Sequence, residues 1–224
     1  ALHVFGQGEY DWQLIISVIA ILTITVGNFS ALWQKDAKRM MAYSAIAHSG
    51  FLLVGIAAFL PQGISFMLFY ATVYLLMNFA VFTFLQSFAI HGIDTIPSFS
   101  VAGKSSLVPA IGITIALVAL TGLPPTAGFT AKLLIFSGLW EAYAETDKML
   151  LLCLLIFGLL NTVVSLFFYL RIPYYAFLKD ATVEYTEKKG AFENLLGLIL
   201  VLVIVGIFFL PGLLMGLINR IKFV

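Results

Sequence analysis

The sequence predicts an all-α polytopic membrane protein with six transmembrane spans, the fourth of them discontinuous between Gly122 and Gly128. Hydrophobic residues make up 62% of the 224 residues and charged residues only 10%, with a mean hydropathy of +1.06. A soluble domain of this composition would expose large apolar patches. The apolar residues also fall into runs of about 20 or more, the length that crosses the hydrocarbon core of a bilayer as a helix.

The first three spans follow one another through short joints. They cover residues 12–34, 39–60 and 63–89. The charged segment 35–38 separates the first span from the second, and Pro61 and Gln62 separate the second from the third. Because charged residues and proline interrupt an apolar helix, these joints mark the ends of the spans.

The fourth span, residues 106–143, is too long for one straight crossing. Its middle contains Gly122, Pro124, Pro125 and Gly128. A proline inside a helix removes a backbone donor and clashes with the preceding turn, and glycine favours an unwound chain. The pattern therefore predicts a helix that breaks between Gly122 and Gly128 and then resumes.

The fifth and sixth spans cover residues 149–177 and 192–218, and a charged loop separates them. No stretch has the composition of a separate soluble domain, so we expect residues 1–224 to form a single transmembrane domain. The chain begins at Ala1 without a methionine or a signal peptide. We therefore expect that Ala1 is a processed end or that further residues precede it.

The basic residues of the loops predict how the spans are oriented. Most of them fall on one side when alternate loops are counted, and this side is predicted to be cytoplasmic, which leaves both chain ends outside. The residues on that side are Lys35, Lys38, Arg39, Lys104, Arg171, Lys179, Lys188 and Lys189. The residues on the other side are Lys148, Arg220 and Lys222.

Charge and cysteine usage argue against several classes of protein. The net charge of +1 argues against nucleic acid as a partner. Cys153 lies among leucines, where a cysteine serves as a small apolar residue. The three histidines, His3, His48 and His91, are far apart in the sequence and lack metal-ligand spacing. We expect no metal and no cofactor on this chain.

The broken span gives the strongest functional signal. Unwound backbone at membrane depth is tolerated only where protein or water satisfies its polar groups, so broken helices tend to mark ion or substrate sites. Thr126 and Thr130 add hydroxyls beside the break. Lys132 lies about two helical turns beyond Pro125. The pattern predicts a polar path for an ion at this depth.

Lys132 is the candidate relay group of that path. Burying a lysine at the centre of a membrane helix costs about 3 kcal/mol on insertion scales, and ionisable residues there are more often functional than structural. The sequence therefore predicts that Lys132 gains and loses a proton. The alternative is a proline kink used for packing, with a lysine that pairs with a carboxylate.

His48 lies in the second span, with Ser44 one turn before it on the same helix face. Its imidazole could pass a proton, because histidine titrates near physiological pH. It could equally be a hydrogen-bonded packing residue in a contact between small-residue helices. Both interpretations stay open.

Two further spans carry polar residues at four-residue intervals, so each has a polar stripe along one face. A stripe of this kind either holds water along an ion path or hydrogen-bonds a neighbouring helix. The stripes are Tyr70, Tyr74 and Asn78 in the third span, and Asn161, Ser165 and Tyr169 in the fifth. The candidate path residues are Tyr74, Asn78, Thr126, Thr130, Asn161 and Ser165.

Two segments resemble a known family. Residues 27–50 read GNFSALWQKDAKRMMAYSAIAHSG, and residues 120–132 read LTGLPPTAGFTAK. Both are similar to motifs of the antiporter-like subunits of respiratory complex I. The Thr-Ala-Gly-Phe form of the second motif favours subunit N of bacterial NADH:quinone oxidoreductase, the counterpart of mitochondrial subunit 2. The resemblance extends over essentially the whole chain.

The resemblance implies a fold of two inverted repeats, each with a broken helix. The chain resembles the second repeat, residues 12–178, and the last helix, residues 192–218, and nothing in it matches the first repeat. Lys132 then takes the place of the lysine in the second broken helix, at the outward proton half-channel. His48 matches a histidine on the central polar axis, and Tyr74 stands where some paralogues have a further histidine.

The resemblance also implies a function. The chain would be a proton-translocating membrane subunit of respiratory NADH:quinone oxidoreductase in the bacterial inner membrane, with no redox chemistry of its own. NAD, FMN, iron-sulfur clusters and quinone would belong to partner subunits. Its partners would be other membrane subunits, the lipid bilayer and protons. A subunit of a multisubunit cation/proton antiporter and a structural membrane scaffold stay as alternatives, as does sodium in place of the proton.

Overall fold

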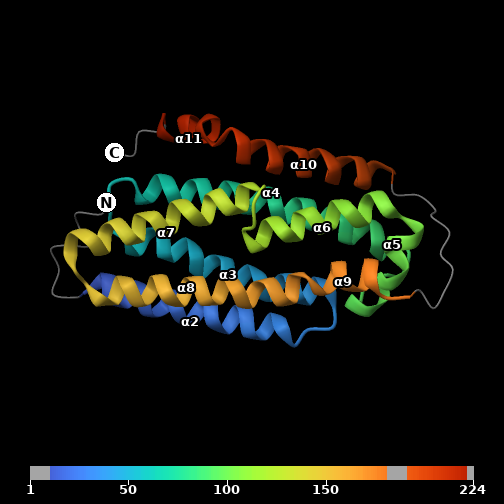
Figure 1. Cartoon of the computed structure of the whole chain (residues 1–224), viewed down its shortest axis with the longest axis horizontal. Coiled ribbons are helices and arrows are strands. Elements are labelled where there is room, and N and C mark those ends of the chain that lie inside the picture. Colours follow the sequence, from blue (N-terminus) through green and yellow to red (C-terminus); the bar gives the residue numbers. More distant parts are fainter. Residues whose placement is uncertain (1–10, 181–190, 221–224) are drawn as a thin grey trace.

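The computed structural model describes residues 11–180 and 191–220 and places most of them in helices (Figure 1). Within these ranges β-structure is limited to one antiparallel bridge between Asp36 and Thr95. The expected charged loop at 181–190, with Lys188 and Lys189, lies outside the described residues, as do His3 and Lys222.

Three long helices open the fold, at the positions that the apolar runs predict. They are α2 (Trp12–Leu32), α3 (Ala37–Ala57) and α4 (Gly63–Ala89). Asp11 and Asp36 cap the first two helices, each accepting a hydrogen bond from a backbone N–H in the first turn. A Cβ atom at Gly27 of α2 would lie 2.5 Å from the backbone nitrogen of Ala47 of α3, so glycine is what allows the two backbones to pack this closely.

The second half of the chain begins with a short connector. After the connector formed by η1 (Ile96–Val101) and α5 (Ala102–Ser105), the fourth predicted span appears as α6 (Leu107–Thr121) and α7 (Ala127–Thr146). It is followed by α8 (Met149–Tyr169), α9 (Arg171–Leu178), α10 (Ala191–Phe209) and α11 (Pro211–Asn219).

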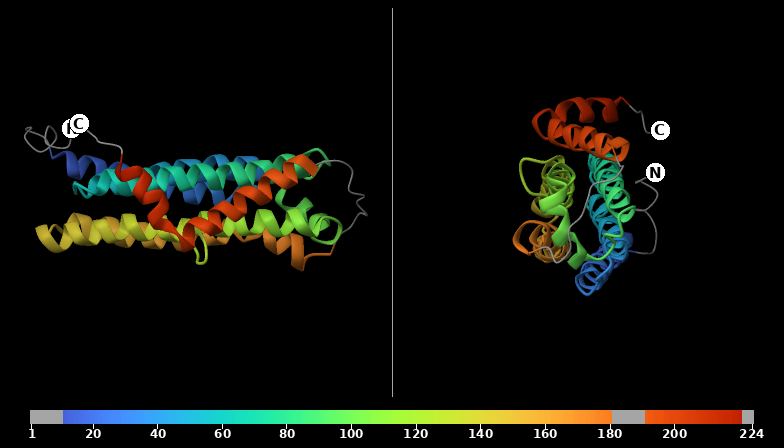
Figure 2. Two further views of the ribbon diagram at one scale, coloured as in Figure 1. Left: turned by 90° about the horizontal axis from the view of Figure 1, so that it is seen from above. Right: turned by 90° about the vertical axis from the view of Figure 1, so that its right-hand side faces the viewer.

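The long helices run side by side along one axis (Figure 2). In the end view, α2, α3 and α4 form one row, and α8 together with α6 and α7 forms a second row beside it. The last two helices, α10 and α11, lie across the edge of both rows, with α10 against α4 and α6. Two rows of helices therefore enclose the core in which the candidate residues lie.

Five helices of the described part are long and apolar enough to cross a membrane: Trp12–Leu32, Ala37–Ala57, Gly63–Ala89, Met149–Leu178 and Phe192–Phe209. Their outward faces carry large apolar side chains, among them Leu22, Phe79 and Phe167, each more than half exposed. An apolar exterior around a buried polar centre is the pattern of an integral membrane protein.

The last span differs from the continuous helix expected at 192–218. The structure divides it into α10 and α11, which meet at Leu210. Pro211 is the first residue of α11, and because proline lacks an N–H group it cannot continue the hydrogen-bond ladder of α10. The two helices form an open V in the left panel of Figure 2.

Candidate functional site

The break between α6 and α7 is the first element of the site. Gly122 ends α6 with φ +84° and ψ +42°, the left-handed conformation that glycine adopts without strain. Pro124 and Pro125 follow, joined by a cis peptide bond, and Thr126 has an extended backbone before α7 begins. Residues 122–126 are therefore non-helical, as the paired prolines predict.

Gly128 lets the start of α7 pack directly against the end of α6. A Cβ atom at this position would collide with the carbonyl oxygen of Ala119 in α6 and would lie 3.1 Å from the sulfur of Met77 in α4. The glycine thus holds the two helix ends together across the break. This close approach brings the first turns of α7 level with the last turn of α6.

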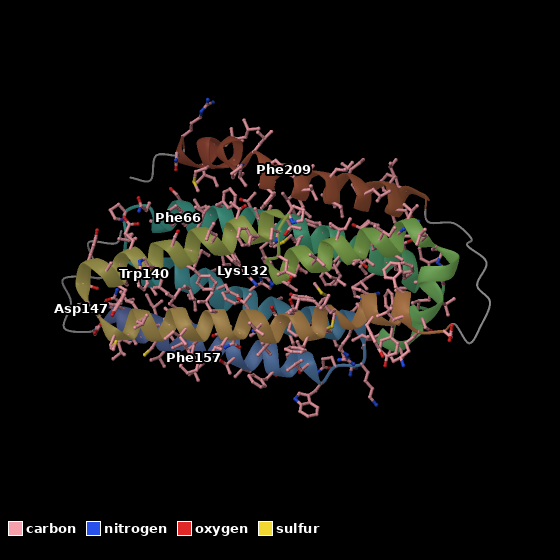
Figure 3. All side chains as sticks on the ribbon, in the orientation of Figure 1. Phe66, Lys132, Trp140, Asp147, Phe157 and Phe209 are labelled. Atoms are coloured by element: carbon pink, nitrogen blue, oxygen red, sulfur yellow. The ribbon has the colours of Figure 1, made fainter. Side chains whose placement is uncertain are left out.

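Lys132 lies in that position, near the middle of the long axis of the bundle (Figure 3). Its side chain is buried, with 5% of its surface exposed. The ammonium Nζ donates hydrogen bonds to the carbonyl oxygens of Thr121, at 2.7 Å, and Leu120, at 3.3 Å. The last carbonyls of a helix lack partners within the helix and form the negative end of its dipole. Lys132 therefore caps α6 from the far side of the break.

Lys132 has no carboxylate within ion-pair distance in the part of the chain that the structure describes. Its nearest aromatic neighbour is Phe51 of α3, with Nζ at 4.9 Å from the ring centroid, close enough for a cation–π contact. Backbone carbonyls and an aromatic ring thus replace the carboxylate that the packing alternative requires.

His48 is the centre of a second cluster, formed by α3, α4 and α8. Its ring nitrogen Nδ1 lies 2.7 Å from the hydroxyl of Tyr70, and Nε2 lies 3.1 Å from the hydroxyl of Tyr169. The Tyr169 hydroxyl is also hydrogen-bonded to Ser44 Oγ. Tyr74 stacks on the imidazole, with 4.5 Å between ring centroids. Each polar atom of the imidazole therefore has a hydroxyl partner inside the core.

The two clusters meet at Phe51. Its ring centroid lies 6.1 Å from that of His48 and 4.9 Å from Nζ of Lys132. Both titratable groups therefore lie near the same ring, close enough for a charge on one to act on the other. In the apolar core such an interaction is screened far less than it would be in water. The protonation of either residue can therefore influence the other.

The remaining candidate path residues divide into two groups. Tyr74 belongs to the His48 cluster, and Thr130 is half-buried on α7 next to the break. Three others are hydrogen-bonded within their own segments. Thr126, Asn78 and Ser165 each donate to a backbone carbonyl of their own segment, at 2.6, 3.1 and 2.7 Å.

Asn161 joins α8 to α2. It accepts a hydrogen bond from Asn28 Nδ2 at its side-chain oxygen, at 3.2 Å, and at its backbone oxygen, at 3.0 Å. Its own amide donates to Phe157 O at 3.0 Å and to Thr25 Oγ1 at 3.3 Å. The contacts of Asn161 are those of an interhelical hydrogen-bond pair.

Three residues of the site were not among the candidates from the sequence. Tyr70 and Tyr169 belong to the polar stripes, but only their meeting at His48 distinguishes them from the other stripe members. Phe51 has no polar atom, and its one sequence signal is its position three residues after His48, on the same face of α3. All three belong to the site because of how the helices pack, and residue spacing in the sequence does not reveal that packing.

The site has the parts of a proton path. It contains an amine and an imidazole, both able to gain and lose a proton, and hydroxyl groups that can donate and accept at once. Among the described residues, no three His, Cys, Asp or Glu side chains are grouped closely enough to hold a metal ion. The chemistry that these residues support directly is proton transfer.

Comparison with known proteins gives consistent results. A family model described as NADH:quinone oxidoreductase/Mrp antiporter, transmembrane, matches residues 2–167. The chain is 31% identical over 210 residues to NADH-quinone oxidoreductase subunit N of Jannaschia sp., covering 93% of the chain and 42% of that protein. It is 36% identical over 207 residues to subunit N 2 of Chloroherpeton thalassium, covering 90% of the chain and 40% of that protein. The chain thus spans about two fifths of the length of these relatives.

Solved structures share the fold. A chain of respiratory complex I from Thermus thermophilus superposes with a TM-score of 0.73 and 25% identity, covering 90% of this chain and 44% of that one. A chain of the Mrp complex from Dietzia sp. superposes with a TM-score of 0.79, covering 93% of this chain and 46% of that one, at 17% identity, which shows likeness of fold alone.

Proposed function

The chain belongs to the transmembrane family shared by NADH:quinone oxidoreductases and Mrp antiporters, and from that premise we propose that it forms part of a proton-translocating membrane subunit of a respiratory NADH:quinone oxidoreductase. The observation that carries the proposal is Lys132, a buried lysine held by the carbonyls of a broken helix and without a carboxylate partner in the described part of the chain. In this proposal NAD, FMN, iron-sulfur clusters and quinone belong to partner subunits.

We propose that α6 and α7 together form one discontinuous transmembrane span, and that α10 and α11 together form the sixth. The 15 residues of α6 are about 22 Å long at about 1.5 Å per residue, shorter than the hydrocarbon core of about 30 Å. The helix therefore ends inside the membrane. Figure 1 supports this assignment, since α6 and α7 run end to end along the bundle.

The proposed mechanism couples Lys132 to His48. When Lys132 is protonated, its ammonium stabilises the end of α6 and repels a second positive charge on His48. When Lys132 releases its proton toward the outer side, that repulsion disappears and His48 can accept the next proton. Alternation of the two charges would move protons one at a time along the core.

The exposed surface at the break supports a partner protein. Leu123, Pro124 and Pro125 are exposed, although they lie at the depth where α6 ends. Lipid cannot satisfy the backbone carbonyls of a non-helical segment, so protein or water must cover it. Either another membrane subunit or the part of a longer protein that precedes this chain would cover the break.

We propose that the end of the bundle that contains Lys35, Arg39 and Arg171 faces the cytoplasm. The guanidinium of Arg171 donates to the carbonyl oxygens of Leu32 and Gln34, at 2.9 and 2.8 Å. Arg171 is therefore at the same end of the bundle as Lys35. Basic residues are enriched on the cytoplasmic side of membrane proteins. Both described ends of the chain then lie on the outer side of the membrane. The membrane in this proposal is the inner membrane of a bacterium.

Proton pumping by the assembled complex tests the proposal. In vesicles that contain the purified complex, we expect Lys132→Ala to lower the number of protons moved per NADH oxidised by more than half, because the relay group is removed. Lys38→Ala is the control, since it removes an exposed lysine from the first turn of α3. A normally assembled Lys132→Ala complex that pumps like the control would contradict the proposal and favour a structural scaffold.

A cation/proton antiporter subunit is the second candidate, and the family model that NADH:quinone oxidoreductases share with Mrp antiporters supports it. The two functions differ in their energy source. Vesicles that acidify only when NADH and quinone are supplied favour the oxidoreductase. Vesicles that exchange sodium for protons without quinone favour the antiporter.

A further inference from the structure

The hydrogen bonds around His48 form a chain of donors and acceptors that runs through the imidazole ring. A neutral imidazole has one N–H donor and one acceptor nitrogen, and a tyrosine hydroxyl donates once. In the described part of the chain Tyr70 has no hydrogen-bond partner besides Nδ1 of His48, and it is 1% exposed. In one arrangement of the hydrogens its proton goes to Nδ1, because a buried hydroxyl left without an acceptor is costly.

The other end of the imidazole follows from this assignment. If Nδ1 accepts from Tyr70, then Nε2 carries the hydrogen and donates to the Tyr169 hydroxyl. The Tyr169 proton is then free to point at Ser44 Oγ, its other partner. Ser44 is buried and has no second hydrogen-bond partner in the described part of the chain, so this arrangement leaves its own proton unpaired. The opposite arrangement would leave the Tyr70 proton unpaired.

The chain leads away from Lys132. Phe51, which contacts the ammonium of Lys132, follows His48 by three residues, whereas Ser44 precedes it by four. Ser44 is therefore one turn nearer to the start of α3, at the basic end of the bundle. Tyr169 is the last residue of α8, two residues before Arg171, whose guanidinium donates to the carbonyl oxygen at the end of α2.

We infer that Tyr169 and Ser44 form a proton route between His48 and the basic end of the bundle, and that Tyr70 is a positioning residue that fixes the imidazole for it. This route rests on the proposed function and adds a second branch to it, on the side of His48 away from Lys132. It connects His48 to the basic end of the bundle.

Each transfer along the route is balanced. Uptake runs from the basic end toward His48, in the arrangement in which Nδ1 carries the imidazole hydrogen and Nε2 accepts from Tyr169. The Tyr169 proton passes to Nε2 while Tyr169 takes the proton of Ser44, and Ser44 takes one from a hydronium ion at the basic end. Tyr169 and Ser44 each take one proton as they give one, His48 gains one and becomes the imidazolium, and no electron is transferred.

Tyrosine-to-phenylalanine substitution tests the route in vesicles that contain the whole complex. We expect Tyr169→Phe to lower the rate of proton pumping at least about tenfold, since positioned proton-transfer groups contribute factors of this size or larger. Tyr174→Phe is the matched control, because this tyrosine is 44% exposed on α9. The solvent deuterium isotope effect on pumping should rise in Tyr169→Phe and stay unchanged in the control.

Ser44 provides a second, independent measurement. Ser44→Ala should slow pumping and Ser44→Thr, which keeps the hydroxyl, should restore most of it. Because the groups act in series, the double variant Tyr169→Phe with Ser44→Ala should pump no more slowly than Tyr169→Phe alone. If Tyr169→Phe fails to assemble, the comparison of Ser44→Ala with Ser44→Thr decides.

Two results would overturn the route. One is a Tyr169→Phe complex that pumps at the control rate with the control isotope effect, and the other is equal pumping by Ser44→Ala and Ser44→Thr at the unsubstituted rate. Lys132→Ala measured in the same vesicles separates the two proposals. Loss of pumping in Lys132→Ala together with either of these results rejects the route alone, whereas unchanged pumping in Lys132→Ala rejects the proposed function.

Discussion

The ammonium of Lys132 lies 2.7 Å from the carbonyl oxygen of Thr121, the last residue of α6. This contact joins α7 to the end of α6 through a titratable side chain. A charged ammonium donates three hydrogens and opposes the negative end of the helix dipole, whereas a neutral amine donates two and carries no charge. The protonation state of Lys132 and the stability of the end of α6 are therefore linked.

Lys132→Met and Lys132→Gln should separate the two contributions of this residue. Methionine keeps the apolar stem without a donor, so we expect the break to lose up to about 2 kcal/mol of capping stabilisation, the upper end for a cation at a partly buried helix terminus. Glutamine keeps a donor and should lose less. The temperature at which the purified complex dissociates measures the difference, and equal values for both variants would contradict a capping role. Neither variant should pump.

Gly122→Ala should destabilise the break by about 1 to 2 kcal/mol, because Gly122 has φ +84° and alanine is strained in the left-handed region. The added Cβ would also lie 2.7 Å from Cδ of Lys132 and displace its side chain. We expect a lower dissociation temperature and slower pumping.

Gly206→Ala is the control for that substitution. Gly206 lies within α10, and a Cβ atom there would meet nothing within 4 Å. Alanine favours a helix interior, so this variant should be as stable as the unsubstituted protein or slightly more so. A Gly122→Ala complex with the stability of Gly206→Ala would show that the left-handed turn is not required.

The positions of the helices follow from local chemistry and could be predicted from the sequence. Aspartates begin α2 and α3, and Gly122 with the following prolines ends α6, because capping and helix termination depend on adjacent residues. The division at Pro211 depends on the same chemistry but escaped the prediction, since hydropathy continues unbroken through it. Apolar composition locates a span but does not establish that it is straight.

The site required information that one sequence does not hold. The buried position of Lys132 follows from its place in the span, but its carbonyl partners depend on how the break folds back on α6. Tyr70 and Tyr169 come from helices far apart in the sequence and meet only at His48. Helical spacing indicates which residues share one face, whereas the neighbour that this face meets depends on the packing of the whole bundle.

Asn161 is where the two interpretations of the polar stripes can be separated. Its hydrogen bonds to Asn28 and Thr25 join α8 to α2, and hydrogen bonds of this kind between membrane helices contribute about 0.6 kcal/mol on average and up to about 1.7. If Asn161 serves packing, Asn161→Ala should lower the dissociation temperature of the complex and leave the protons moved per NADH unchanged. Combining it with Asn28→Ala should add little further loss of stability, because both variants break the same pair.

Ser165→Ala is the comparison, since the hydroxyl of Ser165 donates only within its own helix, at 2.7 Å to Thr162 O. A fall in pumping with Asn161→Ala at unchanged stability would instead return Asn161 to the proton path, because a water-holding amide can be lost without weakening the helix contact.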